Sequence, residues 1–299
     1  MKKISFIIIA YNEEKNIRTC IESILAQDGV TDYEIVVVND ASTDGTEYRV
    51  NQVAQSVKNM KIVNFKKNLG RGAARYEGVL NSTGDYIAFV DADTILPPEW
   101  TAVCLTNLKK FDAVGGIAVP DGDVSYIYRK FGFKPKITFH TAELTGNNCM
   151  IRKNVLERIK FNKNLRDGED VDFVWRAKTA GYKVKSISNL IVKHIENKSY
   201  IKSLHWLFQS GIGATKLLFK HKKFRLPDVL FFTFIFLILT YLRYFWYILT
   251  VYPIVISFFH IRSKFYFGFR DLPGIIGAVI INYLLMLAYF SGRLAGLFL

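Results

Sequence analysis

The chain has 299 residues and half of them are apolar, which is enough to build a sizeable core and more than one structural region. Its formal charge of +14 is unevenly spread: residues 1–125 carry 13 Lys/Arg against 17 Asp/Glu, whereas residues 126–225 carry 22 against 7. The three scattered cysteines indicate neither a disulfide framework nor a zinc site. Because the basic stretch adjoins the most apolar part of the chain, an anionic membrane face or a phosphate-bearing ligand explains it better than nucleic acid does.

The first 120 residues alternate between strand-like and helix-like patterns. Continuous apolar runs predict buried strands at 4–10, 34–38, 61–65 and 86–90. Apolar residues at helical spacing predict helices at 17–25 and from about residues 46 and 72. This order predicts an α/β fold with a mostly parallel sheet and helices on both faces. Ligands of such sheets bind beyond the carboxyl ends of the strands, and a polar segment follows each of these four strands.

The pattern is less regular between residues 112 and 194. Residues 112–119 are expected to form a strand, and 144–159 a strand or loop followed by a helix. Residues 168–187 predict a helix that ends at Gly181 and then a strand. A further strand-like run at 190–194 closes this part of the chain.

Two carboxylates one residue apart, Asp91 and Asp93, directly follow the fourth predicted strand. Buried carboxylates are costly unless something positive lies between them. Such a pair can share a hard divalent cation with a diphosphate, which supplies further oxygen ligands. A turn with an aspartate helix cap before Pro97 and Pro98 is the structural alternative.

The loops after the first three strands carry side chains suited to a nucleotide. A carboxylate such as Asp40 can accept a base N–H, and an aromatic such as Tyr11 can stack on the base, although Asp40–Gly45 also has the composition of an ordinary turn. In the third loop, Gly70 allows close backbone approach while Arg71 and Arg75 suit phosphates. The loop is not a Walker motif and does not follow the first strand, so dinucleotide binding is disfavoured.

The pair Glu169–Asp170 opens a predicted helix. It can complement the helix dipole, or it can act as a general base for an acceptor hydroxyl. Trp175 and Arg176 follow on the same helix and are candidates for lining an acceptor pocket. His194, at the end of the last strand-like run, is either a third metal ligand or a structural histidine.

The C-terminal third has the composition of a membrane-associated region. Residues 200–220 mix apolar and basic side chains, which suits either an interfacial amphipathic helix or a helix covering the preceding domain. Basic residues at 216, 220, 222, 223 and 225 then precede the apolar segment 229–259, in agreement with the positive-inside rule. That segment favours a hairpin over a single crossing, and 272–299 is a further candidate span.

The N-terminal apolar run is too short for a signal peptide, so we expect the first domain to stay in the cytoplasm.

Five segments in a fixed order resemble the motifs of family 2 glycosyltransferases, which have the Rossmann-like GT-A fold. They are SFIIIAYNEEKNIRTCIESILAQ, EIVVVNDASTDGT, NLGRGAARYEGV, YIAFVDADT and LRDGEDVDFVWRAKTAGYKV. The resemblance covers residues 3–210. It implies a GT-A domain at 1–198, which composition and apolar patterning extend with an interfacial segment at 199–226 and a membrane region of two or three segments at 227–299.

The resemblance also assigns roles to particular residues. The nucleotide base is expected to be held by Ala10, Tyr11, Glu13 and Asp40. The family's D-x-D motif binds Mg²⁺ or Mn²⁺ and the sugar diphosphate, here through Asp91, Ala92 and Asp93. The aspartate of the Glu169–Asp170 pair acts as base. The implied reaction moves a sugar from a nucleotide-diphosphate donor, UDP-linked sugars being favoured, with inversion at the anomeric carbon.

One departure from the family bears on the acceptor. Polymer-making members carry a Q-x-x-R-W motif on an interfacial helix, whereas the comparable stretch WLFQSGIGATK has Gln209 without a following Arg-Trp. We therefore expect a single transfer to a membrane-linked acceptor, a polyprenyl-linked glycan or polyprenyl phosphate, in a cell-surface glycan or protein glycosylation pathway. Dolichol-phosphate mannose synthase is similar in layout. The expected protein is multi-pass in the cell membrane with a cytoplasmic catalytic domain and no nucleic-acid partner. A non-catalytic nucleotide-sugar-binding scaffold is the alternative.

Overall fold

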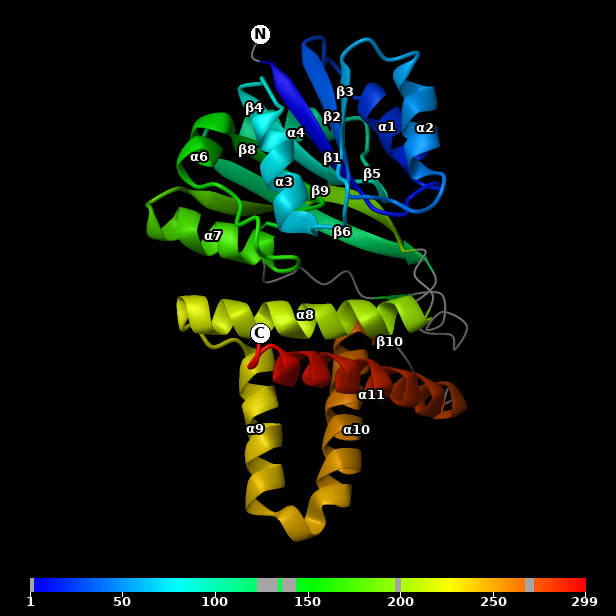
Figure 1. Ribbon diagram of the computed structural model, residues 1–299, viewed down its shortest axis with the longest axis vertical. Helices are drawn as coiled ribbons and strands as arrows, with labels where there is room; N and C mark the ends of the chain where they lie inside the picture. Colours follow the sequence, from blue (N-terminus) through cyan, green and yellow to red (C-terminus); the bar gives the residue numbers. More distant parts are fainter. Residues whose placement is uncertain (1–2, 123–133, 136–143, 197–199, 267–271) are drawn as a thin grey trace. The chain divides into compact units, whose positions relative to one another are not determined.

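The computed structural model describes residues 3–122, 134–135, 144–196, 200–266 and 272–299. The chain divides into one unit formed by residues 1–121 and 139–195 and a second formed by 122–138 and 196–299. Figure 1 labels the helices and strands of both units.

The first unit is built on an eight-stranded sheet with the strand order β3-β2-β1-β4-β8-β6-β9-β5. Its strands are β1 Ile4–Ala10, β2 Tyr33–Asn39, β3 Met60–Asn64, β4 Tyr86–Asp91, β5 Thr94–Ile95, β6 Ala113–Gly122, β8 Asn148–Arg152 and β9 Val184–Glu196. Its helices are α1 Ile17–Leu25, α2 Thr46–Ala54, α3 Arg71–Leu80, α4 Trp100–Asn107, α6 Lys153–Arg158 and α7 Glu169–Thr179.

The predicted α/β architecture is confirmed, and its sheet is mixed. Strand β1 pairs in parallel with β2 and β4, and β2 pairs in parallel with β3. Beyond β4 the direction changes, because β8 pairs antiparallel with both β4 and β6, and β5 pairs antiparallel with β9. The parallel part matches the regular βα repeats of the sequence, and the antiparallel part matches the stretch where the pattern was irregular.

Strand β1 is buried on both faces, which explains its continuous apolar sequence. Phe6 and Ile8 pack in a cluster with Trp100 and with residues of α1 and α2. Ile7 points to the opposite face and packs with residues of α3 and α7, including Phe173. Helices therefore cover both faces of the sheet, and the carboxyl ends of β1, β2 and β4 meet at one edge.

A buried carboxylate ties the opposite edge of the sheet together. Glu34 on β2 accepts hydrogen bonds from Ser5 Oγ at 2.6 Å and from Thr83 Oγ1 at 2.8 Å, and Thr83 N also donates to it. The ammonium groups of Lys61 and Lys3 lie 3.3 and 3.5 Å from its second oxygen. Burial opposes its ionisation, but these donors and charges prevail and lower the pKa of Glu34 to about 2.

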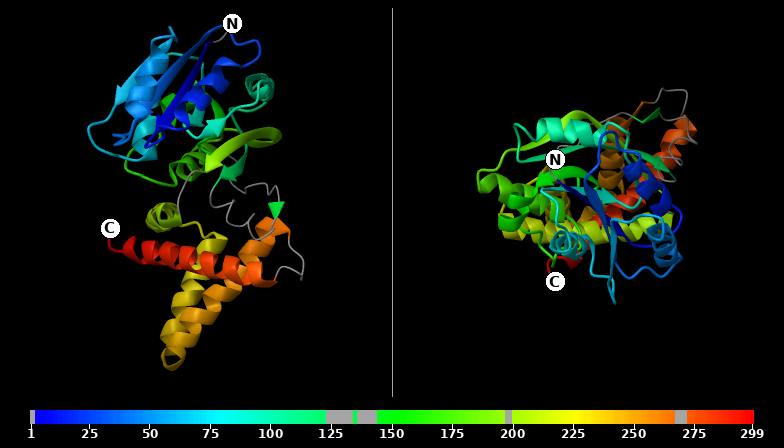
Figure 2. Two further views of the ribbon diagram at one scale, coloured as in Figure 1. Left: turned by 90° about the vertical axis from the view of Figure 1, so that its right-hand side faces the viewer. Right: turned by 90° about the horizontal axis from the view of Figure 1, so that it is seen from above.

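The second unit contains four long helices, α8 Tyr200–His221, α9 Leu226–Thr240, α10 Phe245–Lys264 and α11 Leu272–Ala295. A short 3₁₀ turn, Leu242–Tyr244, joins α9 to α10, and the two helices form an antiparallel hairpin (Figure 1). Figure 1 shows α8 and α11 at the open end of that hairpin, and the left view of Figure 2, in which α8 is seen along its axis and α11 from the side, shows that the two helices cross. A two-stranded sheet pairs β7 Lys134–Pro135 with β10 Phe265–Tyr266.

Within the described residues, two helical segments of this unit are long and apolar enough to cross a membrane, judged by length and composition alone. They are Leu242–Phe259 and Ile276–Ala295, and α9 is a shorter apolar helix. This finding fits the predicted membrane anchoring.

The Glu34 network generates a prediction about acid stability. Because the folded-state pKa is depressed below the ordinary value of 4.5, the contribution of Glu34 is present above pH 4.5 and is lost as the pH falls towards about 2. Glu34→Gln is expected to lower the free energy of unfolding by roughly 2 kcal/mol at pH 7 and to flatten its acid dependence. Thermal unfolding in detergent between pH 2 and 7 measures both effects. Glu22→Gln, on an exposed face of α1, is the control, and equal acid profiles for Glu34→Gln and wild type would contradict the prediction.

Candidate active site

The loops that follow β1 and β2 are bound to each other by side-chain hydrogen bonds. Asn12 N donates to Ser42 Oγ at 3.0 Å, and Thr43 N donates to Asn12 Oδ1 at 2.7 Å. Glu13 N donates to Thr46 Oγ1 at 2.8 Å. The two predicted nucleotide-base loops are thus one connected surface at the carboxyl edge of the sheet.

The predicted base-binding residues occupy distinct places on this surface. Ala10 is buried at the end of β1, where its carbonyl accepts a hydrogen bond from Asp40 N at 2.9 Å. Tyr11 is 47% exposed, which leaves its ring face accessible for stacking. The carboxylate of Glu13 accepts a hydrogen bond from Asn16 Nδ2 at 2.7 Å.

Asp40 connects the second loop to the third. It is almost fully buried, and its two oxygens accept hydrogen bonds from Leu69 N at 2.6 Å and Gly70 N at 2.8 Å. Burial raises the pKa of Asp40, while these N–H donors favour the charged form. Asp40 therefore positions the start of α3. A nucleotide base bound here would have to donate its N–H to the lone pairs of the Asp40 oxygens that are not used by Leu69 N and Gly70 N.

A buried guanidinium lies at the centre of the candidate site. Arg75 on α3 is 1% exposed; its Nη2 donates to Asp91 Oδ1 at 2.9 Å and its Nη1 to Glu169 Oε1 at 2.8 Å. Burial raises the pKa values of both carboxyls, and the Arg75 charge opposes that rise. The side chain predicted to bind phosphate is thus engaged with two acids. Its neighbour Arg71 is more exposed and pairs with Asp167.

The D-x-D segment forms a tight connection between β4 and β5. Ala92 is buried, and its N–H donates to Ile9 O at 3.1 Å. The carbonyl of Asp93 accepts a hydrogen bond from Ile195 N at 2.7 Å. The pairing of β5 with β9 brings His194 to this turn, where its Nε2 lies 3.1 Å from Asp93 Oδ2. Two predicted metal ligands from distant sequence positions are therefore adjacent.

The acid pair at the start of α7 is divided between two environments. Glu169 is 1% exposed and points to Arg75, whereas Asp170 is only partly buried. The Asp170 oxygens accept hydrogen bonds from Gly146 N at 3.2 Å and Val171 N at 2.8 Å. Of the two carboxylates, Asp170 is the more exposed.

The two predicted acceptor residues are not gathered on the face that carries Asp170. Trp175 lies five residues further along α7, which places it about 140° around the helix. Arg176 Nε donates to Asp172 Oδ2 at 2.8 Å, and its Nη2 donates to the carbonyl of Lys160 at 2.7 Å. An acceptor role for either residue stays a prediction.

Gly146 is a site residue that the sequence reasoning missed. A Cβ placed on it would lie 2.1 Å from Arg75 Nη2, so only glycine leaves room for the guanidinium. Its N–H also reaches Asp170. The available signal was a glycine two residues before a buried strand, which by itself indicates no more than a loop.

The donor set suits a hard divalent cation that is shared with a ligand. Within the described ranges, no three His, Cys, Asp or Glu side chains gather closely enough to hold a metal ion by themselves. Asp91 and Asp93 provide carboxylate oxygens, and Mg²⁺ in particular is commonly bound by one or two carboxylates together with substrate phosphates. The residues present therefore fit a metal whose remaining ligands come from a diphosphate.

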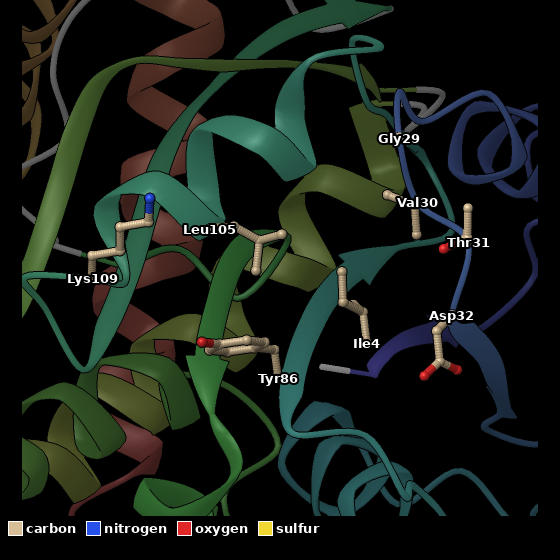
Figure 3. A pocket seen from close by; sticks show the side chains of 8 residues that line it. All are labelled: Ile4, Gly29, Val30, Thr31, Asp32, Tyr86, Leu105 and Lys109. Atoms are coloured by element: carbon tan, nitrogen blue, oxygen red, sulfur yellow. The ribbon is translucent and has the colours of Figure 1, made fainter. Parts of the chain in front are cut away.

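A cavity at the other end of the sheet lies apart from these groups. It has a volume of about 250 Å³, and Figure 3 shows its lining residues, Ile4, Gly29, Val30, Thr31, Asp32, Tyr86, Leu105 and Lys109. Ile4 and Tyr86 are the first residues of β1 and β4, whereas Asp91 is the last residue of β4. The cavity is therefore not part of the candidate site.

Comparison with known proteins places the chain among sugar-transferring enzymes. The sequence model described as Glycosyl transferase family 2 matches residues 5–160. Glycosyltransferase AglE of Haloferax volcanii is 29% identical over 202 residues, which are 64% of this chain and 66% of that protein. A dolichyl-phosphate beta-glucosyltransferase of Trichomonas vaginalis is 38% identical over 97 residues, 30% of each chain. These matches span about two thirds or less of either relative's own length.

A solved structure extends the likeness of fold to almost the whole chain. Mannosyltransferase PcManGT from Pyrobaculum calidifontis, in complex with GDP-Man and Mn²⁺, superposes with a TM-score of 0.61 at 17% sequence identity. The alignment covers 97% of this chain and 86% of the mannosyltransferase. At this identity the likeness shows the GT-A fold.

The Arg75 bridge generates a prediction about stability. Removing one partner of a buried ion pair leaves uncompensated charge, so Arg75→Met is expected to cost about 3 kcal/mol of unfolding free energy. Arg71→Met is the matched control on the same helix, because it removes a partly exposed pair whose loss costs at most about 1 kcal/mol. Thermal unfolding of the two variants in detergent measures the difference. Equal melting temperatures would show that Arg75 does not hold the site together.

Proposed function

The chain belongs to glycosyl transferase family 2, and from this membership we propose that it moves a sugar from a nucleotide-diphosphate sugar to a membrane-linked acceptor. The observation that carries the proposal is the convergence of Asp91, Glu169 and Gly146 on Arg75, with Asp93 two residues after Asp91 and Asp170 next to Glu169. One buried cation thus holds one acid of the pair proposed for the donor diphosphate, and it also holds the acid next to the carboxylate proposed for the acceptor.

The donor is proposed to bind at the carboxyl ends of β1, β2 and β4. The base would lie on the connected loops that carry Tyr11 and Asp40, and the diphosphate would lie towards Asp91 and Asp93. UDP-linked sugars remain the favoured donor class of the proposal, and GDP-linked sugars are its first alternative because the PcManGT complex contains GDP-Man.

When bound, Mg²⁺ or Mn²⁺ would be held by Asp91 and Asp93, with His194 beside Asp93, and would offset negative charge on the departing diphosphate. The protein prepares this place by fixing both backbone ends of the turn. Asp91 ends β4, and the Asp93 carbonyl is bonded to Ile195 N. Arg75 compensates part of the negative charge that two neighbouring carboxylates accumulate.

Asp170 is proposed as the general base. Its carboxylate takes the proton of an acceptor hydroxyl while that oxygen forms a bond to the anomeric carbon. The bond from that carbon to the diphosphate oxygen breaks, and its electron pair leaves with the nucleoside diphosphate, so the configuration inverts. A phosphate acceptor is already ionised and would not require this proton transfer.

The acceptor is proposed to be a polyprenyl-linked glycan or a polyprenyl phosphate. The helices long and apolar enough for a membrane support this choice, and so does the similarity to the dolichyl-phosphate beta-glucosyltransferase of Trichomonas vaginalis. The test is to incubate the detergent-solubilised protein with Mn²⁺, a panel of nucleotide sugars and a native membrane lipid extract, and to follow nucleotide release. Release with one donor, dependent on metal and lipid, is expected. Nucleotide binding without release under any of these conditions would favour a non-catalytic scaffold.

Asp93→Ala is expected to lower turnover by at least about 100-fold, because charge stabilisation by a metal is worth several kcal/mol. Nucleotide release with saturating Mn²⁺ measures the effect. Asp28→Ala, which removes an exposed carboxylate, is the control and is expected to keep its rate. Full activity of Asp93→Ala in saturating Mn²⁺ would contradict the proposed metal role.

Asp170→Asn is expected to lower turnover by about 10²–10⁴-fold while nucleotide affinity stays unchanged, because the amide cannot accept the proton. Parallel measurements of nucleotide binding and of sugar transfer separate these effects. An equal loss of both would point to disturbance of the Gly146 contact instead. Undiminished transfer would show that the acceptor needs no base, as expected of a phosphate.

A further inference from the structure

Both ends of α11 lie at the open end of the α9–α10 hairpin. Helix α11 begins at Leu272, eight residues after α10 ends at Lys264, and its C-terminal turn lies beside the start of α9 (Figure 1). A helix whose two ends remain at one end of a membrane-inserted hairpin cannot itself cross the bilayer. By length and composition alone, however, residues Ile276–Ala295 of α11 are long and apolar enough to cross a membrane.

A buried ion pair fixes the C-terminal end of α11 to the beginning of α9. Arg293 Nη1 donates to Asp228 Oδ1 at 2.5 Å, and both side chains are fully buried. The second oxygen of Asp228 accepts a hydrogen bond from Arg225 N at 2.6 Å, which closes the first turn of α9. The Arg293 guanidinium also lies 5.0 Å from the ring centre of Phe231. Asp228 also pairs with the Arg225 guanidinium, whose Nε lies 3.3 Å from Oδ2, so separating this end of α11 from α9 would leave the buried Arg293 charge without its carboxylate.

Helix α11 is also packed against α8, and the two helices cross. Tyr200 OH, at the start of α8, donates to Ile281 O at 3.1 Å. Further along, Thr215 Oγ1 donates to the carbonyl of Arg293 at 3.0 Å. Between these points the backbones approach so closely that a Cβ on Gly292 would lie 1.9 Å from Phe208 O. The contacts extend along most of α11, so α8 and α11 form one layer.

The outer surface of α11 is apolar. Ile276, Ile280 and Leu284 are 54%, 56% and 42% exposed. They recur every four residues, so they form one stripe along the helix. The side that faces α8 instead carries small residues and the buried Asn282. Such a helix suits the boundary between headgroups and acyl chains.

The hairpin has the length and the tip of a membrane-inserted element. Helix α9 has 15 residues and α10 has 20. At 1.5 Å per residue these are about 22 and 30 Å long, against a hydrocarbon core of about 30 Å. Exposed aromatic residues gather at the tip, namely Tyr241, Tyr244, Trp246 and Tyr247. Tyr and Trp are enriched where a membrane meets water.

Charge distinguishes the two ends of the hairpin. Five basic residues stand between 216 and 225 before α9, and Arg262, Lys264 and Arg270 follow the apolar part of α10. At the tip lies Arg243, which is the one charged residue (Lys, Arg, Asp or Glu) in the sequence between residues 229 and 261. By the positive-inside rule the open end, with α8 and α11, is cytoplasmic.

We infer that α9–α10 is a hairpin inserted in the bilayer, while α8 and α11 lie flat on its anionic cytoplasmic surface and return the C-terminus to the side from which α9 enters. The partner surface is a phospholipid bilayer, whose acyl chains cover the Ile276 stripe and whose anionic headgroups face the basic residues. The inference rests on the membrane association of the proposed function and is independent of sugar transfer.

The test is side-specific labelling of single cysteines in the full-length protein in native membranes. Cys20, Cys104 and Cys149 are at most 2% exposed, and burial raises the pKa of each thiol, so the background is low. The introduced cysteines are Lys223→Cys before α9, Tyr247→Cys near the tip and Phe298→Cys near the C-terminus. A membrane-impermeant maleimide is added to inside-out and to right-side-out vesicles.

Lys223→Cys and Phe298→Cys are expected to be labelled in inside-out vesicles and protected in right-side-out vesicles. Tyr247→Cys is expected to be protected in inside-out vesicles. Labelling of Phe298→Cys from the face opposite to Lys223→Cys would show that α11 crosses the membrane and would overturn the inference. Labelling of Tyr247→Cys from the Lys223 face, or release of the protein by alkaline carbonate, would overturn insertion of the hairpin. None of these readouts depends on glycosyl transfer, so the two proposals fail separately.

Discussion

The candidate site depends on the need to neutralise acidic groups that the fold brings together in a buried place. Asp91 ends β4 and Glu169 starts α7, 78 residues further along the chain, and both meet at Arg75. Without a cation between them, burial and mutual repulsion would favour protonation of these carboxyls or opening of the site. One guanidinium with two forked donors holds both, and Gly146 leaves the space for it. Asp93 lies two residues after Asp91 and Asp170 directly follows Glu169, so anchoring these two acids also fixes the backbone beside the proposed metal ligand and the proposed base.

The acids of the candidate site differ in their partners. In both pairs one acid is engaged with Arg75 and the other has a different partner, His194 for Asp93 and Gly146 for Asp170. Burial separates only the second pair, in which Glu169 is 1% exposed and Asp170 is partly buried, because the side chains of Asp91 and Asp93 are 19% and 12% exposed. In the site we propose, therefore, Arg75 fixes Asp91 and Glu169, while Asp91 and Asp93 together serve the metal and donor and Asp170 serves the acceptor.

A buried ion pair also organises the helices of the second unit. Asp228 and Arg293 are fully buried charged residues of the helical unit, and such residues are costly unless paired. Their pairing decides which end of α11 is next to α9. In the arrangement we propose, α10 and α11 have similar hydropathy but different relations to the bilayer, because α10 belongs to the inserted hairpin and α11 is held at its open end. For an enzyme proposed to act on a lipid-linked acceptor, a flat α8–α11 layer would keep the chain at the depth of the headgroups.

The sequence by itself determined the parallel half of the sheet, the order of its loops and the family. Continuous apolar runs such as Ile4–Ala10 must be buried on both faces, and polar segments must follow them where the strands end. Tertiary structure alone decided the antiparallel half, the pairing of Arg75 with Glu169, and the place of His194 beside Asp93. The spacing of apolar residues indicates which face of a helix or strand is buried. It does not indicate which charged side chain from a distant part of the sequence lies against that face. Composition likewise marks residues 272–299 as a candidate span, but hydropathy measures transfer from water and does not distinguish lipid from a neighbouring helix, so only the contacts of α11 led us to propose that it lies on the surface.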